Sequence, residues 1–300
     1  MTTQTAALHR IRASRRNPDR FRTSGQRTGR VVITVLVILW AVLCAIPVLI
    51  AVYSSFKTQA DIITNPFGLP IPPYLQNYVT SFQGTLGGQP MTVYLLNSAI
   101  STILGIILCT IGATLAGYYL ARKTNVATRI SSGYFLVLLT LPPVVTILPL
   151  FTLAGQLGLR NSPWGLGLVL AAAQLPLAVV LMRTFFANFP HELTEAAALD
   201  GASEGRTFMS IVVPLMRGPI GTVALLQGIG MWNELTLAVV LMTNSDSYTV
   251  PLGLSLFRTN TSLDLGAQFA GLTIAIIPIL IAYTIFNKQF IDGLRVGAVK

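Results

Sequence analysis

The sequence predicts an all-α, polytopic membrane protein with six transmembrane helices. Of its 300 residues, 53% are hydrophobic and only 10% are charged, whereas soluble domains carry about 25% charged residues. Several apolar runs are also long enough to cross a bilayer. A single soluble core is therefore excluded. A disordered chain is excluded as well, because disorder requires low hydrophobicity.

The chain begins with a basic segment, residues 1–30, whose eight arginines face a single acid, Asp19. We expect a cytoplasmic tail that can also touch anionic lipid, at about 1 kcal/mol per basic residue. The apolar run 31–53 follows. At about 1.5 Å per residue it reaches about 35 Å, which exceeds a hydrocarbon core of about 30 Å. It is too long for a cleaved signal peptide and is the first predicted transmembrane helix.

Residues 54–92 are polar and rich in proline, which predicts an ordered extracytoplasmic loop. Residues 93–290 form the predicted core domain, and residues 291–300 a cytoplasmic C-terminal tail. The core contains the other five predicted spans: 93–121, 133–154, 163–186, 220–242 and 267–286. Prolines within the spans predict bends in a curved, movable bundle. They are Pro47, Pro142, Pro143, Pro149, Pro176 and Pro278.

The basic residues lie mostly on one side of this topology. Six spans put both termini on the same side, and 17 of the 20 lysines and arginines fall there. Lys57, Arg160 and Arg258 fall on the other side. The positive-inside rule then places both termini in the cytoplasm. The same segregation explains the net charge of +10 without nucleic acid as a partner.

Small residues recur at every fourth position of the second span. On a helix this spacing forms one narrow stripe, where another helix can approach closely. The stripe either packs within this chain or forms a subunit interface or a pathway wall. Gly165 and Gly167 are expected to ease helix packing. The stripe consists of Asn97, Ser101, Gly105, Cys109, Ala113 and Gly117.

Four of the ten acids crowd into the cytoplasmic loop 187–213, namely Glu192, Glu195, Asp200 and Glu204. Pro190 suits the first turn of a short helix, and Gly201 supplies the left-handed residue that stops it. Ser203 can then cap a second helix that runs to Pro214. An apolar stripe with an acidic end suits docking to a soluble partner. The alternative is a surface helix without a partner.

This loop also resembles the cytoplasmic loop signature of the membrane permeases of binding-protein-dependent ABC importers. The matching residues are Glu195-Ala196-Ala197, Asp200-Gly201-Ala202, Ile211 and Pro214, with Val213 in place of the usual leucine. Further segments resemble the smaller, six-span permease of the carbohydrate branch. They are Asn77-Tyr78-Val79, Asn97-Ser98, Ala116-Gly117-Tyr118 with Ala121-Arg122, Trp232-Asn233-Glu234, Gly271-Leu272 and residues 290–300.

The resemblance implies the type I ABC importer permease fold in the cell membrane of a prokaryote. It implies half of a heterodimeric pore for an oligosaccharide or glycoside, with a second permease subunit, two ATPase subunits or domains, and an extracytoplasmic binding protein. This chain would then be no enzyme and bind no cofactor, since the partner ATPase uses ATP and Mg. The implied ATPase-docking residues are Glu195, Ala196, Ala197, Asp200, Gly201, Ala202, Phe208 and Pro214.

Glu234 is the one acid inside a predicted span, and burying it there costs about 2.5–3.5 kcal/mol. With Trp232 and Asn233 it offers an aromatic face, an amide and a carboxylate, which together can grip a sugar. We assign these three residues and Asn97 to a candidate substrate path. The alternative is that Asn233 and Glu234 bind neighbouring helices and hold a bend.

Other classes of protein are less well supported by the residues. A stand-alone secondary transporter of a small polar solute would need an internal repeat and ion-coupling groups within the bilayer. A membrane-embedded enzyme would need paired carboxylates, histidines or a Ser-Lys pair there. Neither pattern is found. The two histidines, His9 and His191, lie beside no cysteine or carboxylate pair that would predict a metal site.

Overall fold

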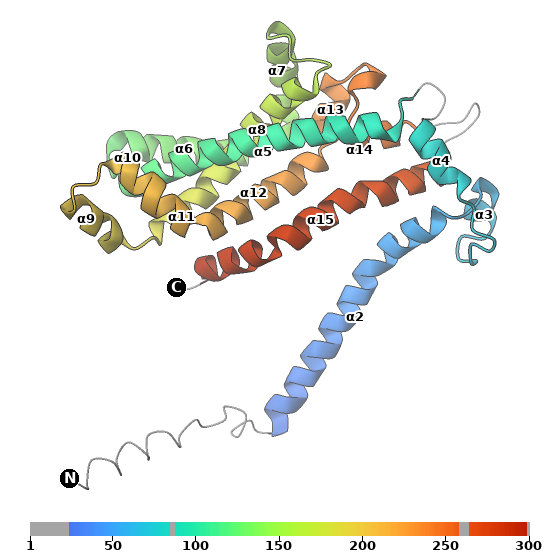
Figure 1. Ribbon diagram of the computed structural model, residues 1–300, viewed down its shortest axis with the longest axis horizontal. Coiled ribbons are helices and arrows are strands. Elements are labelled where there is room, and N and C mark those ends of the chain that lie inside the picture. Colours follow the sequence, from blue (N-terminus) through green and yellow to red (C-terminus); the bar gives the residue numbers. More distant parts are fainter. Residues whose placement is uncertain (1–23, 85–87, 258–263, 299–300) are drawn as a thin grey trace. The chain divides into compact units, whose positions relative to one another are not determined.

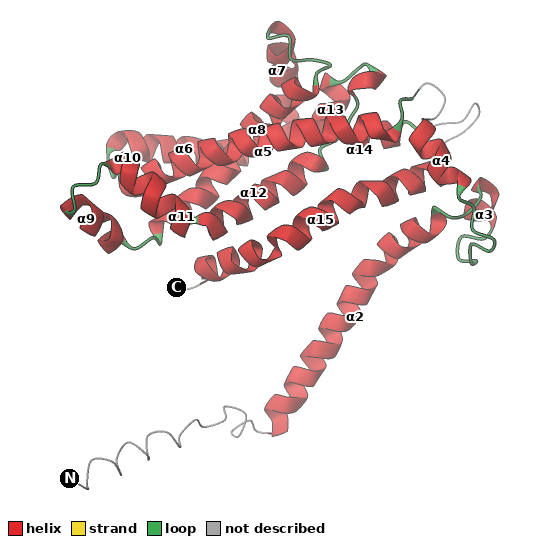
Figure 2. Ribbon diagram, in the orientation of Figure 1, coloured by secondary structure: helices red, strands yellow, loops and turns green. Residues whose placement is uncertain are grey.

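The computed structural model describes residues 24–84, 88–257 and 264–298, in two units, 1–50 and 51–300. All regular elements in these ranges are helices (Figure 2). Four helical segments are long and apolar enough to cross a membrane, and two bent helix pairs raise the total to as many as six spans. The four are Gly29–Ser54, Met91–Arg122, Pro163–Ala187 and Leu265–Asn287.

Helix α2 (Ser24–Ser54) contains the first predicted span and begins seven residues before it. The residues from Val31 to Ile50 are exposed, and nearly all of them are apolar. A helix that is apolar on all sides suits a lipid environment. Residues 1–23 of the predicted basic tail lie outside the described residues.

The second unit is built around α5 (Met91–Arg122), which packs along α8 (Pro163–Ala187) (Figure 1). Every member of the small-residue stripe on α5 is buried. A Cβ atom at Gly117 would lie 2.7 Å from the Cβ of Met182, and one at Gly167 would lie 2.8 Å from the carbonyl oxygen of Ser101. The stripe therefore serves packing within the chain, and both helices approach too closely for larger residues.

The third predicted span is not continuous. It is divided between α6 (Val126–Thr140) and α7 (Pro143–Gln156), whose axes differ by 105°. Pro142 and Pro143 follow the end of α6, and a proline has no N–H to continue the hydrogen bonds of a helix. The adjacent prolines thus turn the chain sharply instead of bending one helix.

The fifth predicted span is also interrupted. Helix α12 (Arg217–Trp232) ends ten residues earlier than expected, and α13 (Thr236–Leu241) follows after a break. Residues 233–235 form this break, so Glu234 does not lie inside a helix. At its other end, α12 meets the preceding helical segment, Glu204–Leu215, at 73°. By contrast, α15 (Leu265–Ala298) is longer than expected and includes most of the predicted C-terminal tail.

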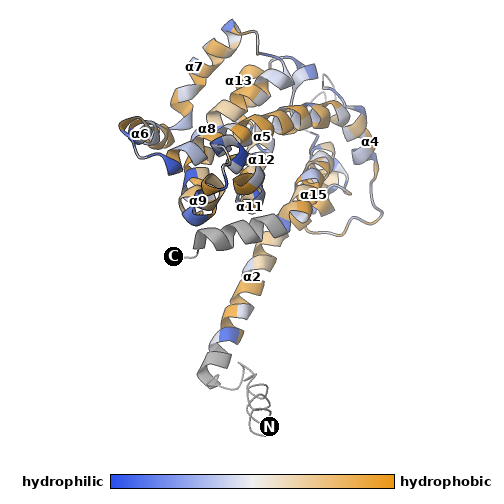
Figure 3. Cartoon of the chain, turned by 60° about the vertical axis from the view of Figure 1, so that its left-hand side comes forward, coloured by the Kyte–Doolittle hydropathy of each residue, from blue (hydrophilic) through white to orange (hydrophobic). Residues whose placement is uncertain are grey.

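Where it is described, the loop 54–92 contains α3 (Gln59–Thr64) and α4 (Gln76–Gln83). The side-chain amide of Asn77 donates to the carbonyl oxygens of Ser55 and Lys57, at 2.8 and 2.7 Å. Helix α14 (Val250–Ser255) lies at the same end of the bundle (Figure 1). The opposite end carries α9 (His191–Leu199), where Figure 3 shows hydrophilic residues beside the hydrophobic helices.

Candidate functional site

The loop after α8 folds as the sequence predicts. Helix α9 is followed by Gly201, whose φ of +76° is the left-handed conformation that suits glycine. The hydroxyl of Ser203 accepts a hydrogen bond from the N–H of Arg206 and caps α10 (Glu204–Thr207). The chain continues through a π-helical turn, η2 (Phe208–Val212), into α11 (Val213–Leu215). We call residues 189–215 the α9 loop.

Aromatic side chains fix the α9 loop to the bundle. The ring of Tyr118, on α5, lies 4.8 Å from the ring of Phe208 and 5.4 Å from that of Phe186, measured between centroids. Phe186 and Phe208 are buried. Arg122, the last residue of α5, lies over the ring of Phe189 and beside His191. Phe189, at the start of the α9 loop, and Phe208, further along it, therefore both contact α5, and these contacts hold the loop.

Lys123 and Glu204 add an exposed ion pair, with Nζ 2.9 Å from Oε1. The hydrogen bond to Glu204 and its negative charge raise the pKa of Lys123 above its ordinary value of 10.5. A raised lysine pKa means that the protonated lysine stabilises the folded form. This stabilisation is fully present below the ordinary pKa of 10.5 and is lost as the pH rises through the raised pKa. Lys123 thus stays charged at physiological pH. Because both side chains are largely exposed, the pair contributes little.

The outer surface of α9 combines charge with exposed apolar residues. Glu195, Ala196, Asp200, Gly201 and Pro214 are exposed, as a docking role requires. Ala197 and Phe208 are only 6% and 7% exposed, and Ala202 is half-buried. Ala197 and Phe208 are thus members of the predicted docking loop whose side chains point into the protein, where they can hold the loop in place.

Sequence reasoning missed two residues of this surface. Leu199, just before Asp200, is 88% exposed, and Met209 is 64% exposed. Both side chains lie near the exposed acids of α9 and are therefore candidates for contact with a partner. The position of Leu199, directly before the Asp200-Gly201 turn, was the sequence feature that could have indicated its exposure. The anchoring role of Phe189 and Arg122 had no local signal, because it depends on residues distant in the sequence.

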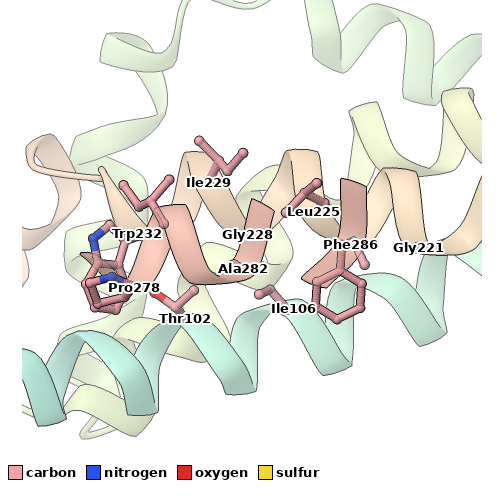
Figure 4. A pocket seen from close by; sticks show the side chains of 12 residues that line it. Thr102, Ile106, Gly221, Leu225, Gly228, Ile229, Trp232, Pro278, Ala282 and Phe286 are labelled. Atoms are coloured by element: carbon pink, nitrogen blue, oxygen red, sulfur yellow. The ribbon is translucent and has the colours of Figure 1, made fainter. Parts of the chain in front are cut away.

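A cavity of about 200 Å³ lies between α5, α12 and α15 (Figure 4). Trp232 and Thr102 are the polar side chains in its wall. The hydroxyl of Thr102 is buried and has no partner among the described residues. The rest of the wall is apolar and includes Ile106, Leu225, Ile229, Pro278 and Phe286. Of the four residues assigned to a substrate path, this cavity contains only Trp232.

The other three residues have hydrogen-bond partners within the chain. Asn97 is 7% exposed, and its amide donates to the carbonyl oxygens of Asp246 and Tyr248, at 2.7 and 3.0 Å. The side-chain amide of Asn233, just after α12, donates to the carbonyl oxygen of Ile229 in that helix. Oε1 of Glu234 accepts from the N–H of Leu237, at 2.8 Å, and so caps the first turn of α13. These bonds favour the bend-holding interpretation of Asn233 and Glu234.

No group of three His, Cys, Asp or Glu side chains comes together as a metal site in the described parts of the chain. The two cysteines are free; Cys109 is buried in the stripe on α5 and Cys44 is exposed on α2.

Comparison with known proteins identifies similar chains of transport systems. The chain is 31% identical over 267 residues to the diacetylchitobiose uptake system permease protein NgcG of Streptomyces coelicolor, covering 88% of this chain and 87% of that one. It is 33% identical over 276 residues to the probable ABC transporter permease protein YurM of Bacillus subtilis, covering 91% and 89%. It is 30% identical to the multiple sugar-binding transport system permease protein MsmG of Streptococcus mutans, covering 89% and 95%.

A solved structure shares the fold. One chain of a bacterial ABC transporter involved in the import of the acidic polysaccharide alginate superposes with a TM-score of 0.74, at 21% identity. The match covers 90% of this chain and 99% of that chain. Residues 111–296, which include α8, the α9 loop and α12, match the family model described as binding-protein-dependent transport system inner membrane component. The chain therefore belongs to the family of inner membrane components of binding-protein-dependent transport systems.

Proposed function

We propose that this chain forms half of the pore of an ATP-driven importer of an oligosaccharide or glycoside. A second permease subunit would complete the pore, and two ATPase subunits or domains would bind on the cytoplasmic side with ATP and Mg. A binding protein outside the cell membrane of a prokaryote would deliver the sugar. The relatives support carbohydrate, because they include uptake-system permeases for diacetylchitobiose, for multiple sugars and for arabinooligosaccharides.

The α9 surface is the observation that carries this proposal. Helix α9 has nine residues and lies at one end of the bundle, with Leu199 and Glu195 exposed. Buried side chains of the same loop attach it to the core of the bundle. A cleft in an ATPase could bury this leucine on docking. Glu195 adds a charge that selects a basic rim.

The contacts of the α9 loop support a route for coupling. ATP-driven movement of the ATPases would displace α9, and the ring of Phe208 would pass this displacement to Tyr118 on α5. Since α5 and α8 approach closely at Gly117 and Gly167, they resist sliding and move together. The bundle would thereby switch between inward-facing and outward-facing states.

Trp232 is our proposed contact for the sugar, because its ring faces the cavity between α5, α12 and α15. An indole ring suits the flat apolar face of a sugar. The wall offers sugar hydroxyl groups only the side chains of Trp232 and Thr102, so the second permease subunit would contribute the other polar groups.

Co-purification tests the central claim. The chain would be tagged in its native host and isolated from the membrane, and an ATPase subunit is expected to accompany it. Leu199→Asp and Glu195→Lys should each reduce the recovered ATPase at least tenfold. Leu157→Asp is the matched control, because Leu157 is an equally apolar, 61% exposed loop residue at the opposite end of the bundle. Normal recovery with both α9 variants would overturn the docking proposal.

Uptake assays test the substrate class. Cells that lack this chain should lose accumulation of one labelled oligosaccharide or glycoside and regain it on complementation. If every oligosaccharide and glycoside tested were still taken up at the normal rate, while another solute were lost, the carbohydrate assignment would be wrong.

A further inference from the structure

A closed loop follows α2. The carbonyl oxygen of Phe56 accepts a hydrogen bond from the N–H of Tyr74, at 2.8 Å, which joins the two ends of residues 56–74. We call this segment the α3 loop, because it contains α3. Oε1 of Gln59, in this loop, accepts from the N–H of Leu265, the first residue of α15, at 2.9 Å. Since a candidate membrane span begins there, the α3 loop lies where that span meets the membrane surface (Figure 1).

Lys57 holds the α3 loop together from within. It is only 3% exposed, and its Nζ donates to the carbonyl oxygens of Asn65 and Pro66, at 2.7 and 3.0 Å. The same nitrogen lies 4.3 Å from the ring centroid of Tyr53, in the last turn of α2. A buried ammonium needs partners of this kind, because burial removes its water. The loop is therefore closed around Lys57 and has a defined form.

Three large apolar side chains lie on the outside of the α3 loop. Phe67, Leu69 and Ile71 are 85%, 75% and 79% exposed. We call these three residues the apolar tip. Residues of these types are among those most often buried in folded proteins. Because the loop is held in shape by Lys57, the exposure of the apolar tip belongs to a built segment.

The apolar tip has no charged neighbour along the chain on its C-terminal side for a long distance. The sequence contains no Asp, Glu, Lys or Arg between Asp61 and Arg122. A surface that binds a soluble protein usually has a polar rim, and charges on such a rim steer the partner. Lipid instead favours aromatic and aliphatic side chains and penalises charged ones. The composition of the tip therefore favours lipid over a soluble protein as its partner.

The backbone around the apolar tip has few N–H groups that need an acceptor. Four of the eight residues 66–73 are prolines, which have no N–H. The N–H groups of Gly68 and Ile71 donate to the carbonyl oxygens of Asn65 and Leu69, at 3.1 and 2.9 Å. Apolar surroundings penalise every unpaired backbone group. A segment with few donors therefore enters the lipid interface at a lower cost than an ordinary loop.

We propose that Phe67, Leu69 and Ile71 insert into the lipid interface at the extracytoplasmic surface and anchor the α3 loop there. Lys57 is the positioning residue that holds the loop in the form that inserts. Through Gln59, the anchored loop fixes the beginning of α15 at the membrane surface. The proposal does not depend on the importer assignment, because it concerns only this chain and the lipid around it.

Accessibility measurements by electron paramagnetic resonance test the insertion. A nitroxide on a single cysteine would be placed at each position of the apolar tip in turn, in the full chain in phosphatidylcholine nanodiscs, with both native cysteines replaced. Each label replaces one anchor and leaves the other two. Oxygen concentrates in lipid and a nickel chelate in water, so all three labels should collide preferentially with oxygen. Ala60→Cys is the matched control and should favour the chelate, because Ala60 is exposed in the same loop beside the exposed Asp61.

Two results would overturn the proposal. Preference for the chelate at most positions of the apolar tip would show that the tip lies in water, where a soluble binding protein could reach it. Protection from both reagents would show that protein, such as a second copy of the chain, covers the tip. Both results leave the importer assignment untouched, since the experiment needs neither ATP nor an ATPase.

Lys57→Met tests the positioning role. Methionine keeps an apolar stem but has no donor for the carbonyl oxygens that Nζ binds, so a label at Leu69→Cys should lose its preference for oxygen. A label at Ile281→Cys, on the exposed apolar surface of α15, should keep that preference, which shows that the bundle still lies in the membrane. Lys123→Met is the matched control, because Lys123 is exposed at the opposite end of the bundle. An unchanged label at position 69 in Lys57→Met would contradict the role of Lys57.

Discussion

The rings of Tyr118 and Phe208 lie 4.8 Å apart and join two segments that are distant in the sequence. Tyr118 belongs to α5, the long helix of the bundle, while Phe208 opens the π-helical turn in the α9 loop. A π-helical turn is rare and is often found at functional sites. This one directs Phe208 into the bundle, where its burial holds the loop.

Phe208→Ala should release the α9 loop from the bundle. Removing a buried phenylalanine costs about 3–5 kcal/mol, through lost burial and the cavity left behind. Limited proteolysis should cut the variant between residues 199 and 215 while the apolar helices remain protected. Met209→Ala is the control, since Met209 is exposed and its loss should change stability by less than about 0.5 kcal/mol. Equal proteolysis of the two variants would show that the Tyr118 contact does not hold the loop.

Gly201→Val should misdirect the chain between α9 and α10. A Cβ atom at this position would meet nothing within 4 Å, so the penalty comes from the backbone. A φ of +76° costs a side-chain-bearing residue roughly 1 kcal/mol or more, and more for a β-branched one.

Transport and stimulation of ATP hydrolysis by the loaded binding protein should both fall in Gly201→Val, with normal membrane insertion. Gly201→Asn should be milder, because asparagine tolerates the left-handed region. Gly205→Ala is the matched control, since Gly205 is helical and equally unobstructed. If the valine variant transported at the normal rate, the turn would not be needed for coupling.

The features that the sequence predicted well are those encoded locally. The stripe on α5 follows from a four-residue spacing, and the turn of the α9 loop follows from Gly201 and Ser203. The two broken spans were missed for a different reason. A hydropathy run does not distinguish a helix bent at Pro142 from two helices, and the cap formed by Glu234 depends on where α12 ends.

Long-range anchors could not be predicted for a similar reason. The contact of Arg122 with Phe189 brings together residues whose spacing in the sequence carries no periodic signal. The exposure of Leu199 is likewise a property of the folded loop. The sequence indicated which segment is the candidate for docking, and the structure distinguishes the outer surface of this segment from its buried anchors.

Glu234→Gln should transport at the normal rate, because an amide oxygen can still accept from the N–H of Leu237. Glu234→Ala should lose this cap, and lost caps cost about 0.5–2 kcal/mol. Its thermal stability should therefore fall, and its transport should fall with it. Thermal unfolding and sugar uptake would be measured on both variants. Normal stability with abolished uptake in Glu234→Gln would instead assign the carboxylate to the substrate path.

The last prediction concerns sidedness. The loop 122–129 and the α9 loop lie at one end of the bundle, since Lys123 pairs with Glu204. The turn near Leu157 lies at the other end, where the side chain of Asn161 accepts from the N–H groups of Thr243 and Asn244. Basic residues are concentrated in the loops of the first end, so the positive-inside rule predicts that this end faces the cytoplasm.

Single cysteines at exposed positions at the two ends would test this orientation. In a background without Cys44 and Cys109, Leu157→Cys should react with a membrane-impermeant thiol reagent in intact cells. Thr124→Cys should react only after permeabilisation, because the membrane separates it from the reagent. Both positions are exposed, so access within the protein does not differ and only the side of the membrane decides the result. Labelling of Thr124→Cys in intact cells, with Leu157→Cys protected, would invert the topology and move the α9 loop away from any cytoplasmic ATPase.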